Sequence, residues 1–519
     1  MDQHRAGVCP LRRPQNILGL RYHDPVSTYH VQNFGCRATQ ADGAAIERQF
    51  QTRGLVPAPV DQAGLIILNT CTVTNSADQD ARAAVRRIQR QNPLARIIVT
   101  GCYAQRAPEE VAALPGVNTV IGNSHKHQLA DLVLGENFAP GKDFLPISAL
   151  TENRELRAEN SIFVSDIFAH TELLVAPVFE SASSLSGRAH DRTRPNLKVQ
   201  DGCDNRCSFC VIPSVRGQSR SLPASQIIDE VNSLVAAGYR ELVISGINLG
   251  RWGRDLKGPL PASRFRRPLF EDLIRRILSE TNLEKLRISS VEPMDWSDEL
   301  IALVAASPRI AKHAHVPLQS GSDAVLRRMH RKYRPWHYRE KIEKIHAAMP
   351  AAAIGADVMT GFPGETDSEF VSTHRLIEEL PFTYLHVFTY SARPSTPAAA
   401  MSNQVPVHVA RERNQILRDL ATSKKQTFMQ SFMGKRLEAI TLSAMQKRPD
   451  GDFTEALTDN YQKLFLKGRH EANRWIRADI AAVEDGALLG SLAVSTPSPN
   501  LGLVPSKLAN TFASARISV

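Results

Sequence analysis

The chain has 519 residues, of which 42% are hydrophobic and 22% are charged. This composition excludes a wholly disordered chain and a fibrous repeat, and the length predicts roughly three globular domains. The formal net charge of +10 favours a polyanionic partner, although a generally basic, solvated surface would explain it equally well. Without an apolar run of about 18 residues or a secretion signal, the sequence predicts a cytoplasmic protein that has no membrane span.

The first third of the chain changes from an irregular segment to a regular one. Residues 1–27 mix charges, prolines and histidines, and they predict a disordered extension that contains Cys9. Residues 28–140 alternate between strand and helix patterns, which predicts a parallel α/β domain. Strands are expected at 28–36, 64–71 and 96–102, and helices at 40–53 and 76–91. Residues 141–192 are rich in Ser, Glu and Ala and predict a linker.

A second α/β series covers residues 193–405. Its six candidate strands are separated by amphipathic helical stretches, a pattern that predicts an open, partial (β/α)6 barrel. The strands are expected at 196–200, 241–246, 285–290, 313–318, 353–360 and 384–390.

The last part of the chain predicts a helix, a small domain and a tail. Residues 406–433 have the pattern of one long basic helix. Residues 434–490 contain short extended segments broken by Asp-Gly and Lys-Gly, which predicts a small β-barrel-like domain. Residues 491–519 are rich in Ser, Ala and Pro and predict a loose tail.

Three cysteines form the strongest chemical signal of the sequence. Cys203, Cys207 and Cys210 have the spacing CxxxCxxC directly after the first predicted barrel strand. Three thiolates can hold three irons of a 4Fe-4S cluster and leave the fourth iron open for chemistry. The alternative is a structural zinc site, but no fourth local cysteine or histidine completes the usual set of four ligands.

Three further cysteines follow predicted strands of the first domain. Cys36, Cys71 and Cys102 each stand where a strand ends. The carboxyl ends of parallel strands meet at one edge of a sheet, so these cysteines can converge in space. Any one of them could instead be a buried apolar filler, but together they favour a second three-cysteine cluster. Cys9 is left over as a bystander.

These residues resemble a known family, the radical S-adenosylmethionine methylthiotransferases, across residues 28–490. The branch that acts on threonylcarbamoyladenosine in tRNA is the most similar, through NTCTVTN at 69–75, NP at 92–93, TGCYAQ at 100–105 and RGQSRS at 216–221. The resemblance implies an enzyme that adds a methylthio group to carbon 2 of N6-threonylcarbamoyladenosine next to the anticodon.

The resemblance also implies the cofactors and partners of the reaction. It assigns one 4Fe-4S cluster to Cys36, Cys71 and Cys102. A second, catalytic cluster on Cys203, Cys207 and Cys210 would bind and cleave S-adenosylmethionine. The first cluster would carry or supply the sulfur. The implied partners are tRNA, an electron donor of the flavodoxin or ferredoxin type, and a sulfur source.

Further S-adenosylmethionine contacts are expected at the ends of the barrel strands. By resemblance, the turn that contains Gly246 and Asn248 approaches the amino group of the cofactor, although a tight strand-to-helix turn would explain the same glycine pattern. Ser290 and Glu292 are expected near the ribose, with a surface charge as the alternative for Glu292. Gln319, followed by Ser320, ends the fourth strand and is expected to line the same site.

Several charged residues have two interpretations. Asp357 lies inside the fifth barrel strand and requires an unidentified partner, as a structural hydrogen-bonding group or as a wall of the site. Arg216 and Arg220 flank the cysteine loop, and arginines suit phosphate contacts. Four further arginines lie on the predicted helix after Cys71. They could contact phosphate groups or simply form a solvated helix face, and both interpretations are equally good. They are Arg82, Arg86, Arg87 and Arg90.

The sequence departs from the pattern of this family in two places, and three rival functions remain. Residues 434–490 should form a TRAM-like RNA-binding β domain, yet the C-terminal region is only slightly basic. Ala38 and Thr39 stand where the family usually has a small apolar residue and asparagine. The rival functions are methylthiolation of isopentenyladenosine in tRNA, methylthiolation of a ribosomal protein aspartate, and a non-catalytic iron-sulfur protein that binds RNA.

Overall fold

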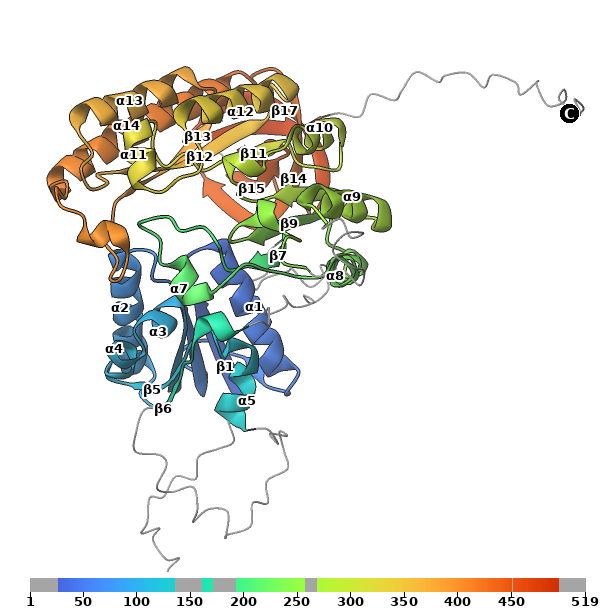
Figure 1. Cartoon of the computed structure of the whole chain (residues 1–519). Helices are drawn as coiled ribbons and strands as arrows, with labels where there is room; N and C mark the ends of the chain where they lie inside the picture. The colour runs from blue at the N-terminus through green and yellow to red at the C-terminus, as the bar shows by residue number, and fades with distance from the viewer. Residues whose placement is uncertain (1–26, 136–160, 171–192, 257–267, 450, 494–519) are drawn as a thin grey trace, which may run out of the picture.

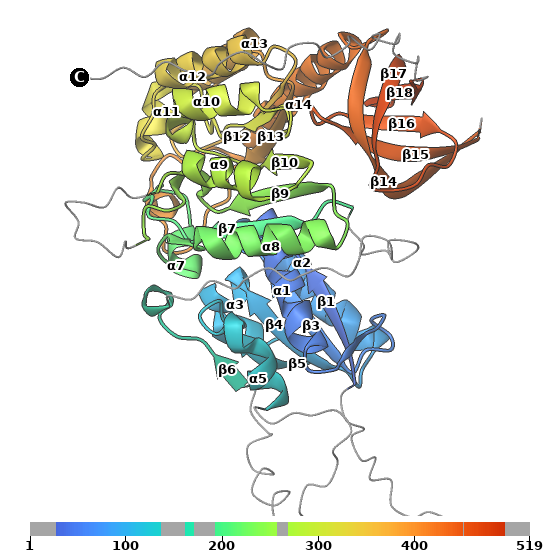
Figure 2. The same cartoon turned by 90° about the vertical axis from the view of Figure 1, so that its right-hand side faces the viewer.

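The computed structural model describes residues 27–135, 161–170, 193–256, 268–449 and 451–493 (Figure 1). The predictions for the N-terminal extension with Cys9, for most of the linker and for the C-terminal tail lie outside these residues. The described residues form an N-terminal domain, a central domain directly above it in Figure 1, and a C-terminal barrel beside the central domain (Figure 2).

The N-terminal domain is a parallel six-stranded sheet with the order β2-β1-β3-β4-β5-β6. Strand residues alternate between two cores: Ile66 and Leu68 pack with α2, α3 and α4, whereas Leu65 and Ile67 pack with α1 and α5. Helices therefore cover both faces, as a parallel sheet requires. The elements are β1 (Thr28–Asn33), α1 (Arg37–Gln51), β2 (Val56–Pro57), β3 (Leu65–Thr70), α2 (Asn75–Gln91), β4 (Arg96–Gly101), α3 (Cys102–Arg106), α4 (Pro108–Ala112), β5 (Val117–Ile121), η1 (Lys126–Gln128), α5 (Leu129–Leu134), β6 (Ser161–Phe163) and η2 (Ile167–Ala169).

The central domain is an open barrel of six parallel strands. Two sheets, β10-β9-β7-β8 and β11-β12-β13, are joined by isolated parallel bridges between Leu286 and Ile310 and between Ser290 and His315. Only the two-residue strand β8 runs antiparallel, at the edge beside β7. The first half comprises β7 (Asn196–Asp201), α7 (Ile212–Arg216), β8 (Arg220–Ser221), α8 (Ala224–Ala236), β9 (Glu241–Gly246), η4 (Leu249–Arg251), α9 (Phe270–Glu280) and β10 (Lys285–Ile288). The second half comprises η5 (Pro293–Asp295), α10 (Asp298–Ala306), β11 (His313–His315), α11 (Asp323–Arg328), α12 (Pro335–Ala348), β12 (Ala353–Thr360), α13 (Asp367–Glu379), β13 (Tyr384–Thr389) and η6 (Pro397–Ala400).

A long helix leads into a closed five-stranded barrel. α14 (Val407–Gln430) buries Leu417 in the core of the central domain and Met429 in the core of the C-terminal barrel. The barrel has the order β14-β15-β16-β18-β17, formed by β14 (Arg436–Arg448), β15 (Gly451–Thr458), β16 (Lys463–Lys467), β17 (Trp475–Glu484) and β18 (Ala487–Leu492). The predicted fold class, with a parallel α/β domain, a partial (β/α)6 barrel and a small β barrel, is confirmed.

The C-terminal barrel is fastened to the central domain by a buried arginine. Arg287 of β10 is 1% exposed and forms an ion pair with Glu241 through its Nε, at 2.7 Å. Its two remaining nitrogens donate to the backbone carbonyls of Asp459 and Thr458, at 3.1 and 3.3 Å. One side chain therefore joins two strands of the central domain to the β15–β16 turn.

Arg287→Ala is expected to lower the thermal unfolding midpoint of the full chain. The substitution leaves Glu241 buried with only the weaker partner Arg194, at 3.3 Å, so a loss of about 3 kcal/mol is expected. The matched control is Arg276→Ala, because Arg276 pairs with Glu280 on the exposed face of α9 and should change the midpoint little. Equal midpoints for the two variants would contradict the assigned role of Arg287.

Candidate iron-sulfur active site

Cys203, Cys207 and Cys210, the central triad, lie in the loop between β7 and α7. The amide of Cys203 donates to the carbonyl of Gly217 at 3.0 Å, and the amide of Cys210 donates to the carbonyl of Cys207 at 3.2 Å. Gly202 has a φ of +70°, and a Cβ there would lie 1.9 Å from the carbonyl oxygen of Gln218. The loop is therefore closed tightly on itself and holds all three thiols at the carboxyl end of β7, where active sites of such barrels lie.

Hydrogen-bond donors surround the sulfurs of the central triad. Cys203 Sγ accepts from the amide of Asn205 at 3.4 Å and from Nδ2 of Asn248 at 3.6 Å. Cys207 Sγ accepts from Arg331 at 3.3 Å. Such donors stabilise thiolate ligands and tune the potential of an iron-sulfur cluster.

Cys36, Cys71 and Cys102, the N-terminal triad, lie just beyond one edge of the first sheet. The last residues of β1, β3 and β4 are in register there, with Asn33 opposite Asn69 and Thr70 opposite Gly101. Cys36 is the N-cap of α1, Cys71 follows β3, and Cys102 is the first residue of α3. The three cysteines thus lie together at one edge of the sheet, as the sequence predicted.

Each sulfur of the N-terminal triad also has a polar neighbour. Cys71 Sγ accepts from the amide of Val73 at 3.5 Å, and Cys102 Sγ accepts from Nδ2 of Asn123 at 3.5 Å. Cys36 Sγ lies 3.5 Å from Oγ1 of Thr39. Both triads therefore have the type of hydrogen-bonded surroundings that cluster ligands require.

The spacing of the thiols suits an iron cluster better than a single metal ion. One tetrahedral zinc ion holds its thiolates about 3.8 Å apart, as its bond length of roughly 2.3 Å to sulfur implies. Among the described residues, the only three His, Cys, Asp or Glu ligand atoms that all lie within 4.8 Å of one another belong to His315, Asp357 and His386. In each cysteine triad the three sulfurs do not all lie within this distance, which fits a cluster in which each thiolate binds a different iron.

Burial makes the thiols dependent on a metal for ionisation. It raises the pKa of Cys71 and of Cys210 to about 12, and it raises the pKa of Cys203 in the same direction. Iron would displace these protons, because a coordinated thiol is deprotonated. The metal-free protein therefore keeps neutral thiols at these three positions near pH 7.

One short helix connects the two triads. α7 begins two residues after Cys210, and its Val215 packs with Val211 against Cys102 of the N-terminal domain. Asn123, which contacts Cys102 Sγ, also donates to the carbonyl of Val215 at 2.8 Å. The same segment thus presents the central triad and contacts the N-terminal triad.

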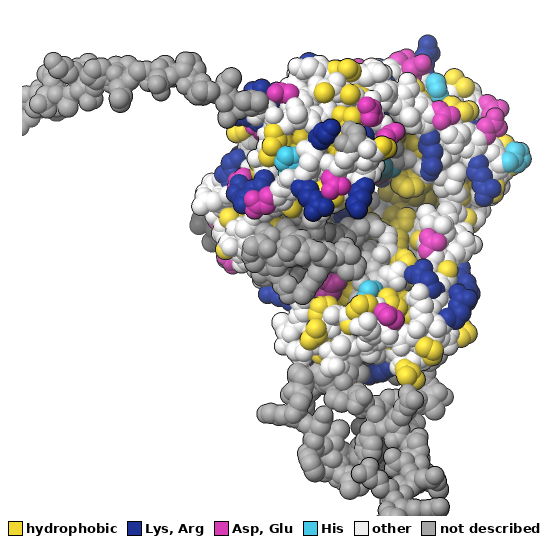
Figure 3. All heavy atoms as spheres, turned by 180° about the vertical axis from the view of Figure 1, so that it is seen from behind, with side chains coloured by type: hydrophobic (Ala, Val, Ile, Leu, Met, Phe, Trp, Pro, Cys, Tyr) yellow, Lys and Arg dark blue, Asp and Glu magenta, His cyan; other side chains and the backbone are white. Residues whose placement is uncertain are grey.

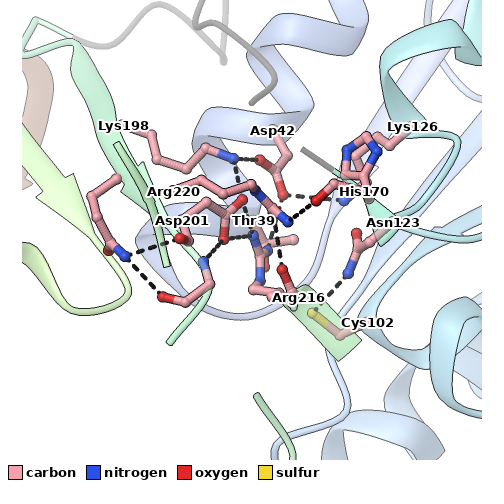
Figure 4. Close-up of polar contacts among 12 residues, drawn as sticks. Thr39, Asp42, Cys102, Asn123, Lys126, His170, Lys198, Asp201, Arg216 and Arg220 are labelled. Carbon is pink, nitrogen blue, oxygen red and sulfur yellow. Dashed lines mark hydrogen bonds and ion pairs between the residues drawn. The ribbon is translucent and has the colours of Figure 1, made fainter. Parts of the chain in front are cut away.

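Five charged residues form a buried ion-pair network at this contact (Figure 4). The network comprises Asp42 of α1, Lys126 of η1, Lys198 and Asp201 of β7, and Arg216 of α7, and the half-buried Arg220 of β8 donates to the backbone carbonyl of Arg216 beside it. Arg216 donates to both oxygens of Asp201, at 3.0 Å each, and to Oδ2 of Asp42 at 2.9 Å. Lys198 contacts both carboxylates, and Lys126 lies 3.1 Å from Asp42.

The cations keep both carboxylates of the network ionised. Burial alone would raise the pKa of Asp42, but Lys126, Lys198 and Arg216 hold it well below its ordinary value. Burial likewise opposes ionisation of Asp201, and Arg216 and Lys198 hold its pKa well below the ordinary range. The prediction that Arg216 contacts phosphate is therefore wrong, since its guanidinium is buried in this network.

Asn248 and Glu292, two predicted S-adenosylmethionine contacts, lie beside the central triad. Asn248 contacts Cys203, and its Oδ1 is buried without a hydrogen-bond partner in the described residues. Glu292 is paired with Arg331, and both line one cavity with Cys207. Tyr333 also lines it.

The other three predicted contacts lie at ends of barrel strands. Gly246 ends β9, and a Cβ there would lie 2.9 Å from Oε1 of Gln200. Ser290 forms the bridge to His315. Gln319 has a φ of +65° and bonds through its amide to the carbonyl of Asp357 at 2.8 Å. Contact of these residues with the cofactor stays a prediction.

The structure supplies the missing partners of Asp357. Oδ1 of Asp357 lies 3.5 Å from Nε2 of His315 and 3.2 Å from Nδ1 of His386. These histidines were absent from the sequence-based prediction, as was Arg331. Of the arginines on α2, Arg82 pairs with Glu110, whereas Arg86, Arg87 and Arg90 are exposed.

Comparison with known proteins agrees with this architecture. Residues 197–377 match the model of the radical SAM superfamily, and residues 28–122 match a model described as uncharacterized protein family UPF0004. The solved radical S-adenosylmethionine methyltransferase TsrM from Kitasatospora setae covers 72% of this chain and is itself covered to 76%, with 15% identity and a TM-score of 0.48. The matched barrel and the cysteine spacing define a radical S-adenosylmethionine enzyme, which uses S-adenosylmethionine and a 4Fe-4S cluster.

Curated relatives narrow this class. Threonylcarbamoyladenosine tRNA methylthiotransferase MtaB of Bacillus subtilis (strain 168) is 35% identical over 447 residues, which are 86% of this chain and 92% of the relative. The tRNA-2-methylthio-N(6)-dimethylallyladenosine synthase of Novosphingobium aromaticivorans is 33% identical over 418 residues, 80% of this chain and 86% of the relative. The chain belongs to the radical S-adenosylmethionine methylthiotransferase family.

Asp357→Asn is expected to change how thermal stability depends on pH. Burial raises the pKa of Asp357, but the hydrogen bonds from His315 and His386 outweigh it and hold the pKa well below the ordinary value. The ionised group therefore stabilises the fold fully above about pH 4, and this contribution declines as the pH falls further. The difference in unfolding midpoint between wild type and variant, measured on cluster-free full chain, should shrink from pH 5 to pH 3. A constant difference would contradict this role.

Proposed function

We propose that this chain adds a methylthio group to carbon 2 of N6-threonylcarbamoyladenosine next to the anticodon of tRNA, with two 4Fe-4S clusters and S-adenosylmethionine. The observation that carries the proposal is the pair of cysteine triads, which are held against each other by α7. The relative from Bacillus subtilis carries this activity in its name and spans 86% of the chain.

The reaction requires two chemical supplies. An aromatic C–H carbon has neither a leaving group nor an acidic proton, so the substitution needs a radical source and a sulfur donor. The central triad with S-adenosylmethionine supplies the radical chemistry, and the N-terminal triad is assigned to the sulfur. Each reaction consumes sulfur and electrons, which is why an electron donor of the flavodoxin or ferredoxin type and a sulfur source are proposed as partners.

Residues of the chain position these components. Asn248 and Arg331 donate to the sulfurs of Cys203 and Cys207 and hold them in place. Glu292, oriented by Arg331, presents a carboxylate to the cavity beside Cys207, where it suits the paired hydroxyls of a ribose. Gly246, Ser290 and Gln319 are proposed as further S-adenosylmethionine contacts at the carboxyl ends of the strands.

Binding of tRNA is proposed for the C-terminal barrel together with the exposed arginines of α2. The face opposite to that of Figure 1 carries Lys and Arg side chains on both its upper and lower parts, interspersed with acidic ones (Figure 3). Arginine guanidinium groups suit phosphate oxygens. None of the helices in the described segments is long and apolar enough to span a bilayer, and a cytoplasmic location is proposed because tRNA is found there.

A second candidate substrate is isopentenyladenosine in tRNA. The relative from Novosphingobium aromaticivorans, whose name gives a dimethylallyladenosine product, is nearly as similar as the relative from Bacillus subtilis. The motifs around Cys71 and Cys102 favour threonylcarbamoyladenosine. The two substrates differ in nucleoside mass, so one experiment separates them.

Expression in cells that lack a native methylthiotransferase is expected to produce methylthio-threonylcarbamoyladenosine in tRNA. The product should disappear with Cys203→Ala and with Cys36→Ala, because each removes a ligand from one triad, and nucleoside mass spectrometry measures it. Methylthio-isopentenyladenosine alone would reassign the substrate. Absence of both products with fully cluster-loaded protein would reject the proposed reaction on tRNA.

Gly35→Ala is expected to remove iron from the N-terminal triad and leave the central triad loaded. Gly35 has a φ of +100°, and an added Cβ would lie 2.6 Å from Cβ and 2.9 Å from Sγ of Cys71. The control is Gly434→Ala, since Gly434 also has a positive φ but no heavy atom within 4 Å of the added carbon. Iron analysis and electron paramagnetic resonance measure both variants, and an unchanged iron content in Gly35→Ala would contradict the second cluster site.

A further inference from the structure

The ion-pair network contains more positive than negative charge. Its three cations, Lys126, Lys198 and Arg216, face two carboxylates, which leaves an excess of one positive charge. The side chains of Lys198, Arg216 and Asp42 are 2% exposed, and that of Lys126 is 4% exposed. An excess of buried charge is costly unless an opposite charge lies nearby.

The N-terminal triad lies beside this excess: Val215, the residue before Arg216, packs against Cys102, and Asn123, which contacts Cys102 Sγ, lines one cavity with Lys126 and Arg216. Burial lowers the pKa of Arg216, but Asp201, the Cys102 thiolate, Asp42 and the Cys36 thiolate together hold it well above its ordinary value. Burial lowers the pKa of Lys126, and Asp42 and charge on Cys102 oppose this effect. The network thus lies next to the N-terminal triad, at the contact between the two domains.

An iron-sulfur cluster on three thiolates is a suitable counter-ion. The three thiolate charges exceed the positive charge of an oxidised 4Fe-4S core, so the ligated cluster is an anion. Reduction adds a further negative charge. Nearby positive charge therefore favours the reduced form and raises the potential, and net charge and hydrogen bonds are among the factors that set such potentials.

The network also joins two domains. Asp42 and Lys126 belong to the N-terminal domain, whereas Lys198, Asp201 and Arg216 belong to the central domain. Arg216 bonds to a carboxylate from each side. A change in the charge balanced by the network therefore acts directly on the contact that holds the two triads together.

We propose that this network is the built-in counter-ion of the cluster on the N-terminal triad, with Arg216 as its positioning residue. The network raises the reduction potential of that cluster and couples its presence to the docking of the two domains. The proposal rests on the second cluster of the proposed function. It adds a residue that acts on the cluster without binding iron.

The test uses substitutions of opposite charge in the same ion pair. In anaerobic, cluster-loaded full chain, Arg216→Gln should move the potential of the N-terminal cluster to more negative values. Asp42→Asn should move it to more positive values, and Arg216→Lys should keep it close to wild type. Redox titration followed by electron paramagnetic resonance gives the potentials, and the signal that S-adenosylmethionine does not perturb is that of the N-terminal cluster.

The opposite signs separate an electrostatic role from a merely structural one. Loss of packing would affect Arg216→Gln and Asp42→Asn alike, so shifts in the same direction, or no shift in either, would overturn the proposal. Lys126→Gln is a milder variant, because the ammonium of Lys126 bonds only to Asp42 and Asn69 among the described residues. It should also shift the potential to more negative values if Arg216→Gln does not fold.

Hydrogen exchange of the wild type tests the coupling without any substitution. Loading with iron and sulfide should increase protection of α1 and α7, with α10 as a remote control. Equal protection of α1 and α7 in loaded and cluster-free protein would overturn the coupling. The potentials and the exchange are measured without tRNA, so opposite shifts in a protein that does not modify tRNA would reject the proposed substrate and retain this inference.

Discussion

The buried contact of Arg216 with Asp201 and Asp42 is the interaction on which the arrangement of the active site depends. Its three hydrogen bonds are 2.9 to 3.0 Å long and connect β7 to α1 through a single guanidinium. Its planar fork bonds both oxygens of Asp201 as well as Asp42 in a fixed geometry, whereas the ammonium of Lys198 contacts one oxygen of each carboxylate as a point charge. Because α7 carries both this arginine and the contact with Cys102, the position of one side chain fixes the N-terminal triad relative to the central one.

Both triads lie at the carboxyl ends of parallel strands, but only the N-terminal triad depends on several strand ends meeting at one edge. The carboxyl ends of successive strands share one edge, so residues just beyond them converge even when they are distant in sequence. Cys36, Cys71 and Cys102 use the edge of the N-terminal sheet, and the central triad uses the end of β7. The network lies between these two strand ends, so the two cysteine triads are placed on either side of one contact between domains.

The positions of the cysteines at the ends of strands could be predicted because their signal is local, whereas their role as iron ligands stays a prediction. The spacing of the thiols and their position after an apolar strand are visible within about ten residues. The strands and helices of the three domains are likewise predicted from local hydrophobic patterns. The network could not be predicted in this way, since Asp42 and Arg216 are 174 residues apart. Arg216 was assigned to phosphate because a guanidinium suits phosphate and carboxylate equally, and only the fold decides which of them it meets. The histidine partners of Asp357 come from neighbouring strands whose register the sequence does not specify.

The contact between β10 and the C-terminal barrel shows why the basic net charge is a weak guide to RNA binding. Arg287 and Lys285 are buried, and they pair with Glu241 and Asp459 instead of facing solvent. The barrel nevertheless reaches the active site, because the hydroxyl of Tyr461 accepts from Arg37 at 3.3 Å while its ring lies 4.4 Å from that of His313. Arg37 directly follows Cys36. Tyr461 of the C-terminal barrel therefore contacts both His313 of β11 and the residue next to Cys36, so three domains meet at one side chain beside the N-terminal triad.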